Sequence, residues 1–174
     1  MFAVKSQSAT ELSGSHLSVL PRSRNLQIVT ATLEDCDVVC QLFRELHRYN
    51  ASLDAHFALS DDWEVFLREE FTTTCYDVDH KWLLVKDGDK AVGLLIAGVH
   101  TDSPLFRHRQ WVEVQALYVA NSHRRMGIAR HLLDCAYTWA TERNLPRVQL
   151  YVTASNVCAQ SVYEDEGFAV TQCI

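Results

Sequence analysis

The segment HRRMGIARHLL, residues 123–133, places three arginines and a glycine at the start of a predicted helix. Glycine is the poorest ordinary helix former, so its presence indicates that the chain needs uncovered backbone there. The first N–H groups of a helix have no partner within it, and together with the helix dipole they attract anions. Arginine matches phosphate geometry, and Gly127 and Ala129 leave room for the anion. The segment predicts a pyrophosphate site, although a helix start with solvated arginines has the same local pattern.

A carboxylate and a phenol are the other side chains whose positions suit chemistry. Glu113 interrupts the apolar strand WVEVQALYV, where a carboxylate is costly to bury unless it faces a cleft and can act as a base. An ion pair with Arg109 is the alternative for Glu113. Tyr163 follows Asn156 by seven residues, so both project from one face of a predicted helix. Its phenol can donate a proton, or its ring can simply pack on the sheet.

Two motifs carry a resemblance to a known family. EVQALYVANSHRRMGIARHLL resembles the central signature of the GNAT superfamily of acyl-CoA-dependent N-acyltransferases, whose R/Q-x-x-G-x-G/A motif is matched by Arg124, Gly127 and Ala129. NVCAQSVYEDEGF resembles the family element N-x-x-A-x-x-x-Y-x-x-x-G-F. Its matching residues are Asn156, Ala159, Tyr163, Gly167 and Phe168. The resemblance covers residues 26–174 and is strongest over 111–168, and two motifs in the expected order are far more specific than one.

The resemblance implies a fold and a co-substrate. The fold would be mixed α/β, with a GNAT-like central, mostly antiparallel sheet flanked by helices and a splayed parallel strand pair that binds acyl-CoA, here acetyl-CoA. Backbone groups of one strand would bind the pantetheine arm, and they belong to Leu117, Tyr118 and Val119. The loop that would hold the pyrophosphate consists of Arg124, Arg125, Met126, Gly127, Ile128, Ala129 and Arg130. Asn156 and Ala159 complete the expected cofactor-binding set.

The same resemblance assigns the chemical roles. An attacking amine must lose a proton, the carbonyl oxygen must be stabilised, and the departing thiolate benefits from a proton donor. The family commonly uses the tyrosine of the second motif as general acid, which implies Tyr163. Glu113, acting directly or through water, is the candidate base, although some members place an acid two positions later, where this chain has Gln115. A backbone N–H near Val119 would stabilise the negative charge on the carbonyl oxygen. Spacing singles out none of the histidines.

Hydrophobic periodicity predicts the elements that would position these groups. Residues 26–30 suit a strand, and the helix that follows has Thr32 and Asp35 as a near capping box. A second helix would begin at Ser60 or Asp61, and Asp87-Gly88 would join two antiparallel strands. The remaining expected elements, in chain order, are a strand at 111–119, a helix through 128–140, a strand at 147–153, a helix from about 156 and a strand at 168–174.

The two ends of the chain carry separate expectations. Residues 1–25 are serine-rich and are expected to form a flexible leader, with a single domain over 26–174. The family fold usually continues into a seventh strand, which the chain does not reach before Ile174. We therefore expect the edge of the sheet to be open or filled by a partner subunit, as in a homodimer.

Composition limits the partners. Lysines and arginines number 16 against 22 acidic residues, and the net charge of -6 argues against nonspecific nucleic-acid binding and mildly favours a cationic small molecule or basic peptide. No apolar run is long enough to cross a bilayer. The six cysteines form no CxxC pair and no zinc-ligand pattern, which predicts a cytoplasmic protein without a metal, with Cys36 and Cys40 in the core.

These observations predict an N-acetyltransferase that moves the acetyl group of acetyl-CoA directly to a primary amine. The acceptor stays open between a polyamine, an aminoglycoside, an amino acid, and a protein lysine or N-terminus. A noncatalytic acyl-CoA-binding module is the alternative, in which Glu113 and Tyr163 only pack. A third possibility, an interaction domain that uses the incomplete sheet edge, leaves the loop at 124–130 unexplained.

Overall fold

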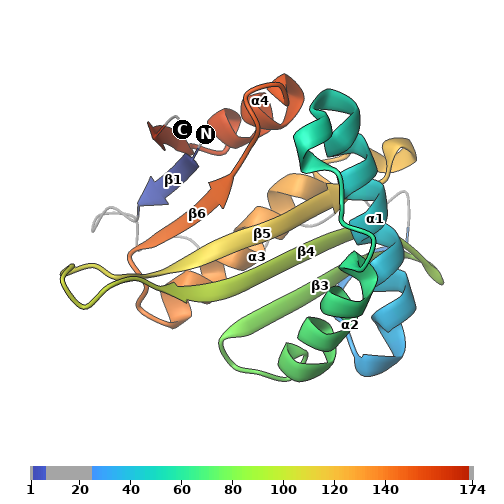
Figure 1. Cartoon of the computed structure of the whole chain (residues 1–174), viewed down its shortest axis with the longest axis horizontal. Coiled ribbons are helices and arrows are strands. Elements are labelled where there is room, and N and C mark those ends of the chain that lie inside the picture. The colour runs from blue at the N-terminus through green and yellow to red at the C-terminus, as the bar shows by residue number, and fades with distance from the viewer. Residues whose placement is uncertain (1, 7–24, 173–174) are drawn as a thin grey trace.

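The computed structural model describes residues 2–6 and 25–172, and its strands form one sheet in the order β2-β3-β4-β5-β6-β1-β7 (Figure 1). The strands are β1 (Phe2–Ser6), β2 (Leu26–Thr30), β3 (His80–Asp87), β4 (Lys90–Thr101), β5 (Gln110–Val119), β6 (Arg147–Tyr151) and β7 (Ala169–Gln172). The helices are α1 (Cys36–Leu53), α2 (Trp63–Thr74), α3 (Ile128–Glu142) and α4 (Val157–Asp165), with 3-10 turns η1 (Leu33–Asp35), η2 (Ala55–Phe57) and η3 (Asn121–His123). Neighbouring strands are antiparallel except β5 and β6, which are parallel. The predicted mixed, mostly antiparallel sheet flanked by helices is confirmed.

Helices cover both faces of the sheet. Alternate strand residues point to opposite sides, and both sides carry apolar residues that need burial. In β3, Trp82 and Leu84 belong to the hydrophobic cluster built with α1 and α2. Leu83 and Val85 belong to the cluster built with α3. In Figure 1 α1 and α2 lie on the near side of the sheet and α3 lies behind it. The sheet is therefore a rigid layer from which the central strands can present functional groups.

The parallel pair is short and ends at a bulge. β5 and β6 are paired only over Val112–Val114 and Val148–Leu150. A shift in the register between β4 and β5 leaves Gln115 as an extra residue between Val114 and Ala116. Such a bulge bends its strand and increases the local twist. Beyond the paired residues β6 turns away from β5 (Figure 1), as the predicted splayed pair requires.

The N-terminal strand differs from the expectation. Phe2–Ser6 form β1, which lies between β6 and β7 and is antiparallel to both. Ala3 is only 4% exposed and belongs to the cluster under α3. A flexible leader is therefore wrong for Phe2–Ser6, because these residues form a strand between β6 and β7 and Ala3 is buried there. The rest of that leader, residues 7–24, and the end of the last predicted strand at 173–174 lie outside the described residues.

Other local predictions hold with small changes. Gly88 has a φ of +60° in the turn between β3 and β4, as the predicted Asp-Gly turn requires. The Thr32 N–H donates to the Asp35 carboxylate at 2.9 Å, and the helix begins with the turn η1 before α1. The N-cap of α2 is Asp62 rather than the predicted Ser60 or Asp61. The elements that frame the predicted site are thus in place.

Candidate active site

The start of α3 leaves its backbone donors uncapped. Gly127 is the N-cap residue with a φ of +77°, and no side chain caps the helix. Two positions earlier Arg125 also has a positive φ, +61°, a conformation that L residues adopt only under constraint. The N–H groups that follow Gly127 are therefore free to receive an anion, with the dipole of α3 behind them. Glycine is needed here for its backbone conformation as well as for its missing side chain.

Two of the three arginines near this loop also have contacts within the protein. Arg124 Nε donates to the Val119 carbonyl at 3.2 Å, and its guanidinium lies 5.0 Å from the centre of the Tyr49 ring. Arg130 Nε lies 3.7 Å from Glu166 Oε2, although the arginine side chain is 65% exposed. Arg125 is exposed and forms no ion pair with any described residue. The loop is thus fastened to α1 through Arg124 and to the end of α4 through Arg130.

A buried histidine anchors the turn before the loop. His123 Nε2 lies 3.1 Å from Asp87 Oδ2, and His123 Nδ1 lies 2.8 Å from Ser122 Oγ. The imidazole is one of the few buried polar side chains. It ties η3 to the end of β3, so that the loop is held from its N-terminal side. Sequence reasoning missed this role, because nothing near His123 in the sequence indicates a partner 36 residues away.

The strand predicted to bind the pantetheine arm runs past the end of the parallel ladder. Leu117, Tyr118 and Val119 pair with β4 on one side, whereas the described ladder to β6 ends at Val114. Their edge toward β6 is therefore available for a ligand, except that the Val119 carbonyl accepts the bond from Arg124. This carbonyl connects the strand directly to the loop.

Glu113 lies at the centre of the sheet. It is paired across the strands with Gly98 of β4 and Gln149 of β6, and its side chain is 19% exposed. His100 Nδ1 lies 3.8 Å from its carboxylate, and no ion pair with Arg109 is found among the described residues. Gly98 itself has no side chain, and the His80 ring and the Gln115 amide lie next to its Cα. The candidate alternative Gln115 is the bulged residue and is exposed.

Tyr163 lies on α4 and is partly buried. Its ring packs edge-on against Phe168 with centroids 5.7 Å apart, and it borders a small cavity together with Ala3 of β1. Burial raises the pKa of Tyr163 to about 12, so the phenol stays protonated at neutral pH and can serve as a proton donor. Asn156 Oδ1 accepts the N–H of Ala159 at 3.2 Å and so caps α4. The structure thus gives Asn156 a helix-capping contact and packs Ala159 against the core.

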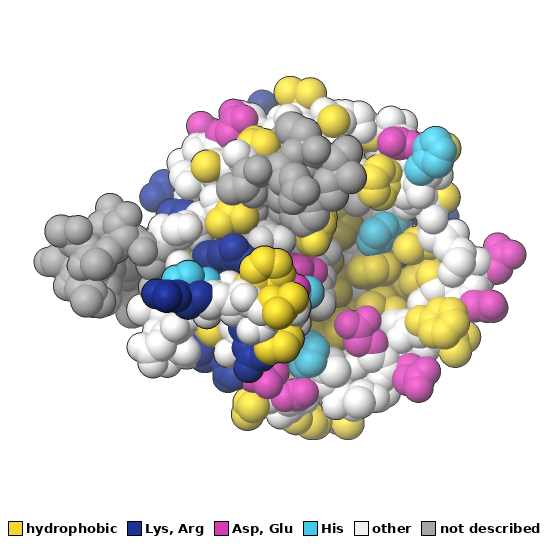
Figure 2. Space-filling view, turned by 60° about the vertical axis from the view of Figure 1, so that its left-hand side comes forward, with side chains coloured by type: hydrophobic (Ala, Val, Ile, Leu, Met, Phe, Trp, Pro, Cys, Tyr) yellow, Lys and Arg dark blue, Asp and Glu magenta, His cyan; other side chains and the backbone are white. Residues whose placement is uncertain are grey.

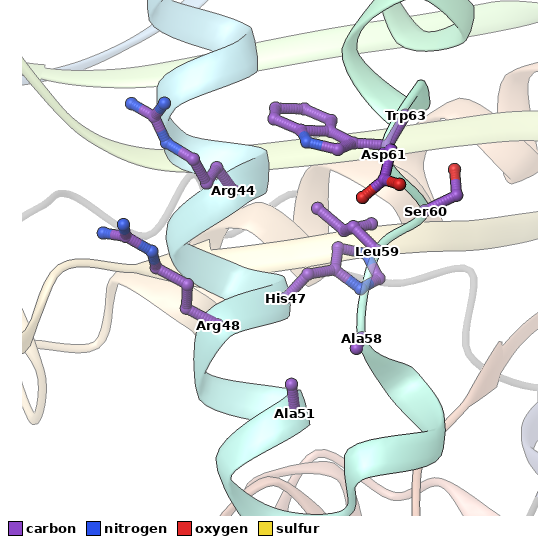
Figure 3. Close-up of a pocket in the computed structure, with 9 residues that line it drawn as sticks. All are labelled: Arg44, His47, Arg48, Ala51, Ala58, Leu59, Ser60, Asp61 and Trp63. Carbon is purple, nitrogen blue, oxygen red and sulfur yellow. The ribbon is translucent and has the colours of Figure 1, made fainter.

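Figure 2 shows that the surface is hollowed in this view, with hydrophobic and histidine side chains exposed on the walls and acidic side chains around it. A separate pocket of about 380 Å³ lies between α1 and the segment from η2 to α2 (Figure 3). Its lining includes Arg44, His47, Asp61 and Trp63, and it contains none of the predicted site residues. Burial lowers the pKa of His47, which keeps its imidazole neutral beside the two arginines of α1 that line this pocket. The pocket is therefore distinct from the predicted cofactor loop.

The described cysteines are free thiols. Cys40 is buried, as predicted, and burial raises its pKa to about 11, while Cys36 packs against the same cluster. The described residues contain no group of three His, Cys, Asp or Glu side chains placed to hold a metal ion. None of the described helices combines the length and apolar character needed to span a membrane.

Comparison with known proteins adds an independent result. The sequence model of the Acetyltransferase (GNAT) family matches residues 37–168. The mycothiol acetyltransferase of Beutenbergia cavernae is 32% identical over 102 residues, which are 59% of this chain and 32% of that protein. The corresponding enzyme of Jonesia denitrificans is 34% identical over 62 residues, 36% of this chain and 20% of that protein. The chain thus spans about a third or less of the curated relatives it matches.

Solved structures share the fold at low sequence identity. The aminoglycoside N-acetyltransferase AAC(6')-Iy in complex with CoA has a TM-score of 0.71 and 16% identity, covering 90% of this chain and 95% of its own. A GCN5-related N-acetyltransferase from Ralstonia eutropha has a TM-score of 0.70 and 22% identity, covering 86% of this chain and 95% of its own. The arrangement of sheet and helices is therefore that of N-acetyltransferases of known structure.

Proposed function

The chain belongs to the acetyltransferase (GNAT) family, and we propose that it transfers the acetyl group of acetyl-CoA directly to a primary amine. The observation that carries this proposal is the uncapped start of α3 at Gly127, beside strands that separate after Val114 and Leu150. An acyl-CoA would place its pyrophosphate on the N–H groups after Gly127 and its pantetheine arm along Leu117–Val119. Arg125, exposed in the loop, would contribute charge to the diphosphate.

The proposed reaction uses three groups of this chain. Glu113, directly or through a water, takes a proton from the acceptor ammonium, and the free amine attacks the thioester carbonyl carbon. A backbone N–H near Val119 stabilises the oxygen as it gains negative charge. As the carbon–sulfur bond breaks, Tyr163 gives its phenolic proton to the thiolate, and the second proton that the nitrogen loses on becoming an amide restores the phenol. Burial raises the pKa of Tyr163 to about 12, so the phenol carries its proton at neutral pH before the thiolate leaves.

We propose an acceptor that carries a primary amine, such as a polyamine, an aminoglycoside, or a protein lysine or N-terminus. The acidic balance of the chain supports a cationic acceptor. Free thiols support a reducing compartment such as the cytoplasm. A noncatalytic acyl-CoA-binding module is the second candidate, and the close packing of Tyr163 on Phe168 is the observation that favours it.

Substitution of Tyr163 separates the two candidates. Acetyl-CoA is mixed with the protein and a panel of primary amines, and thiol release gives kcat and KM. Tyr163→Phe keeps the packing on Phe168 and removes the proton, so kcat should fall about a hundredfold while acetyl-CoA affinity is unchanged. Tyr76→Phe, at an exposed tyrosine, is the matched control. Equal turnover in both variants would remove Tyr163 as the acid, and binding without turnover of any amine would favour the noncatalytic module.

A further inference from the structure

The candidate base has a histidine beside it that the proposed reaction does not use. His100 Nδ1 lies 3.8 Å from Glu113 Oε2, and the two side chains are 43% and 19% exposed. The separation is longer than a direct hydrogen bond, so one bridging water or a small rotation of the imidazole would connect them. The His100 imidazole is thus the more exposed of the two groups. It can exchange protons with solvent when the Glu113 carboxylate is covered.

Stacking holds this imidazole in place. The rings of His100 and Trp111 have centroids 4.3 Å apart and an interplanar angle of 27°. Trp111 is buried, and the Arg147 guanidinium lies 3.9 Å from the centre of its ring. His100 comes from β4, Trp111 from β5 and Arg147 from β6, so the three side chains form one layer across adjacent strands. This layer fixes the imidazole relative to Glu113, which is two residues along β5 from Trp111.

Other titratable groups also surround Glu113. From β6, Tyr151 has its pKa raised by burial and by the negative charge of Glu113, and Arg147 lies beyond Trp111 with its positive charge. The neighbouring β6 residue Gln149 is uncharged. Side chains of both flanking strands, β4 and β6, therefore interact electrostatically with the Glu113 carboxylate.

On the β3 side, the imidazole of His80 already contacts another carboxylate. A Cβ atom placed on Gly98, the partner of Glu113 in β4, would lie 3.4 Å from the His80 ring. His80 Nδ1, however, lies 3.2 Å from Asp77 Oδ2. Among the described histidines, His100 is the one with an ion-pair contact to Glu113.

We propose that His100 relays protons between Glu113 and solvent, an inference that rests on the proposed function. Acetylation of an ammonium releases two protons, of which one ends on the CoA thiol and one must reach solvent. Glu113 takes the proton from the ammonium and passes it from its carboxyl oxygen to Nδ1 of His100. The imidazolium then releases one proton to water, and both groups regain their starting charge. Because His100 acts through Glu113, it is a positioning residue rather than one that touches the substrate.

The test compares variants that preserve packing. His100→Phe keeps an aromatic ring on Trp111 but cannot carry a proton, and His108→Phe changes an exposed histidine of the loop between β4 and β5. We expect His100→Phe to lower kcat about tenfold near neutral pH without changing KM for acetyl-CoA. The loss should shrink as pH rises, because hydroxide and buffer base can then take the proton from Glu113 directly. Added imidazole should restore part of the rate, and His108→Phe should behave as the unmodified protein.

Two results would overturn the relay. A loss of kcat that is the same at every pH and is not rescued by imidazole would mean that His100 only packs on Trp111. Unchanged kcat would mean that the proton leaves by another route. In both cases the unmodified protein still acetylates amines, which distinguishes failure of the relay from failure of the proposed function, where no amine is acetylated by any of the three proteins.

Discussion

The loop before α3 depends on single residues that hold an unusual backbone. Arg125 and Gly127 both have positive φ angles, and the side chains around them tie the loop to three elements. Arg124 contacts the end of β5, Arg130 contacts Glu166, and His123 contacts Asp87 at the end of β3. Strained backbone persists only where its surroundings determine it. The proposed anion site therefore depends as much on these anchors as on the free N–H groups.

His123 provides a test of this anchoring. His123→Ala removes an imidazole that contacts Asp87 and Ser122 and leaves a cavity in a buried position. We expect the free energy of unfolding, measured by urea titration, to fall by about 1–3 kcal/mol. His108→Ala, at an exposed position, should change it by less than about 0.5 kcal/mol. If both variants unfold at the same urea concentration, His123 does not anchor the loop.

At the scale of elements, the bulge in β5 and the insertion of β1 shape the site from opposite sides. The bulge at Gln115 follows the last paired residue of the β5–β6 ladder, so the strand bends where the pantetheine arm of the proposed acyl-CoA would lie. β1 fills the gap between β6 and β7, and Ala3 borders the cavity beside Tyr163. Lys5 Nζ lies 4.3 Å from the centre of the Tyr137 ring on α3. The N-terminal strand thus contacts α3 through Lys5 and borders the cavity next to Tyr163 of α4 through Ala3.

The position of β1 predicts different effects for two substitutions within it. Ala3→Asp would bury an unpaired carboxylate next to Tyr163, whereas Ser6→Asp adds the same charge at an exposed position. We expect Ala3→Asp to lower the free energy of unfolding by about 3 kcal/mol and to reduce acetyl transfer, with little effect of Ser6→Asp. Urea titration and thiol release measure both quantities. Equal stability of the two variants would show that Phe2–Ser6 do not lie in the sheet in solution.

At the scale of the whole molecule, local patterns predicted the elements but not their long-range partners. Apolar runs located the strands and helical spacing located the helices, because a strand covered on both faces is apolar throughout and a helix is buried along one side. The insertion of Phe2–Ser6 was not predictable, since a short strand carries no local signal for a partner more than a hundred residues away.

The same limit applies within the site. The loop at Gly127 and the motif residue Tyr163 were visible in the sequence, because a helix start and a motif are local. The side-chain contact between Glu113 and His100 follows from the β4–β5 register, and the bulge at Gln115 sets part of that register. The contact of His123 with Asp87 likewise depends on how η3 packs on the end of β3. Such contacts exist only in the assembled sheet.

The most direct test of the central claim is calorimetric titration of CoA and acetyl-CoA into the unmodified protein and two variants. Gly127→Ala introduces the strain of a side chain at positive φ, about 1 kcal/mol, without charge. Gly127→Glu adds the same strain and a carboxylate at the proposed diphosphate position. We predict that the unmodified protein binds both ligands, that Gly127→Ala binds them more weakly, and that Gly127→Glu does not bind them while keeping its circular dichroism spectrum. Absence of binding by the unmodified protein, or equal affinity of the two variants, would contradict the assignment of this loop to acyl-CoA.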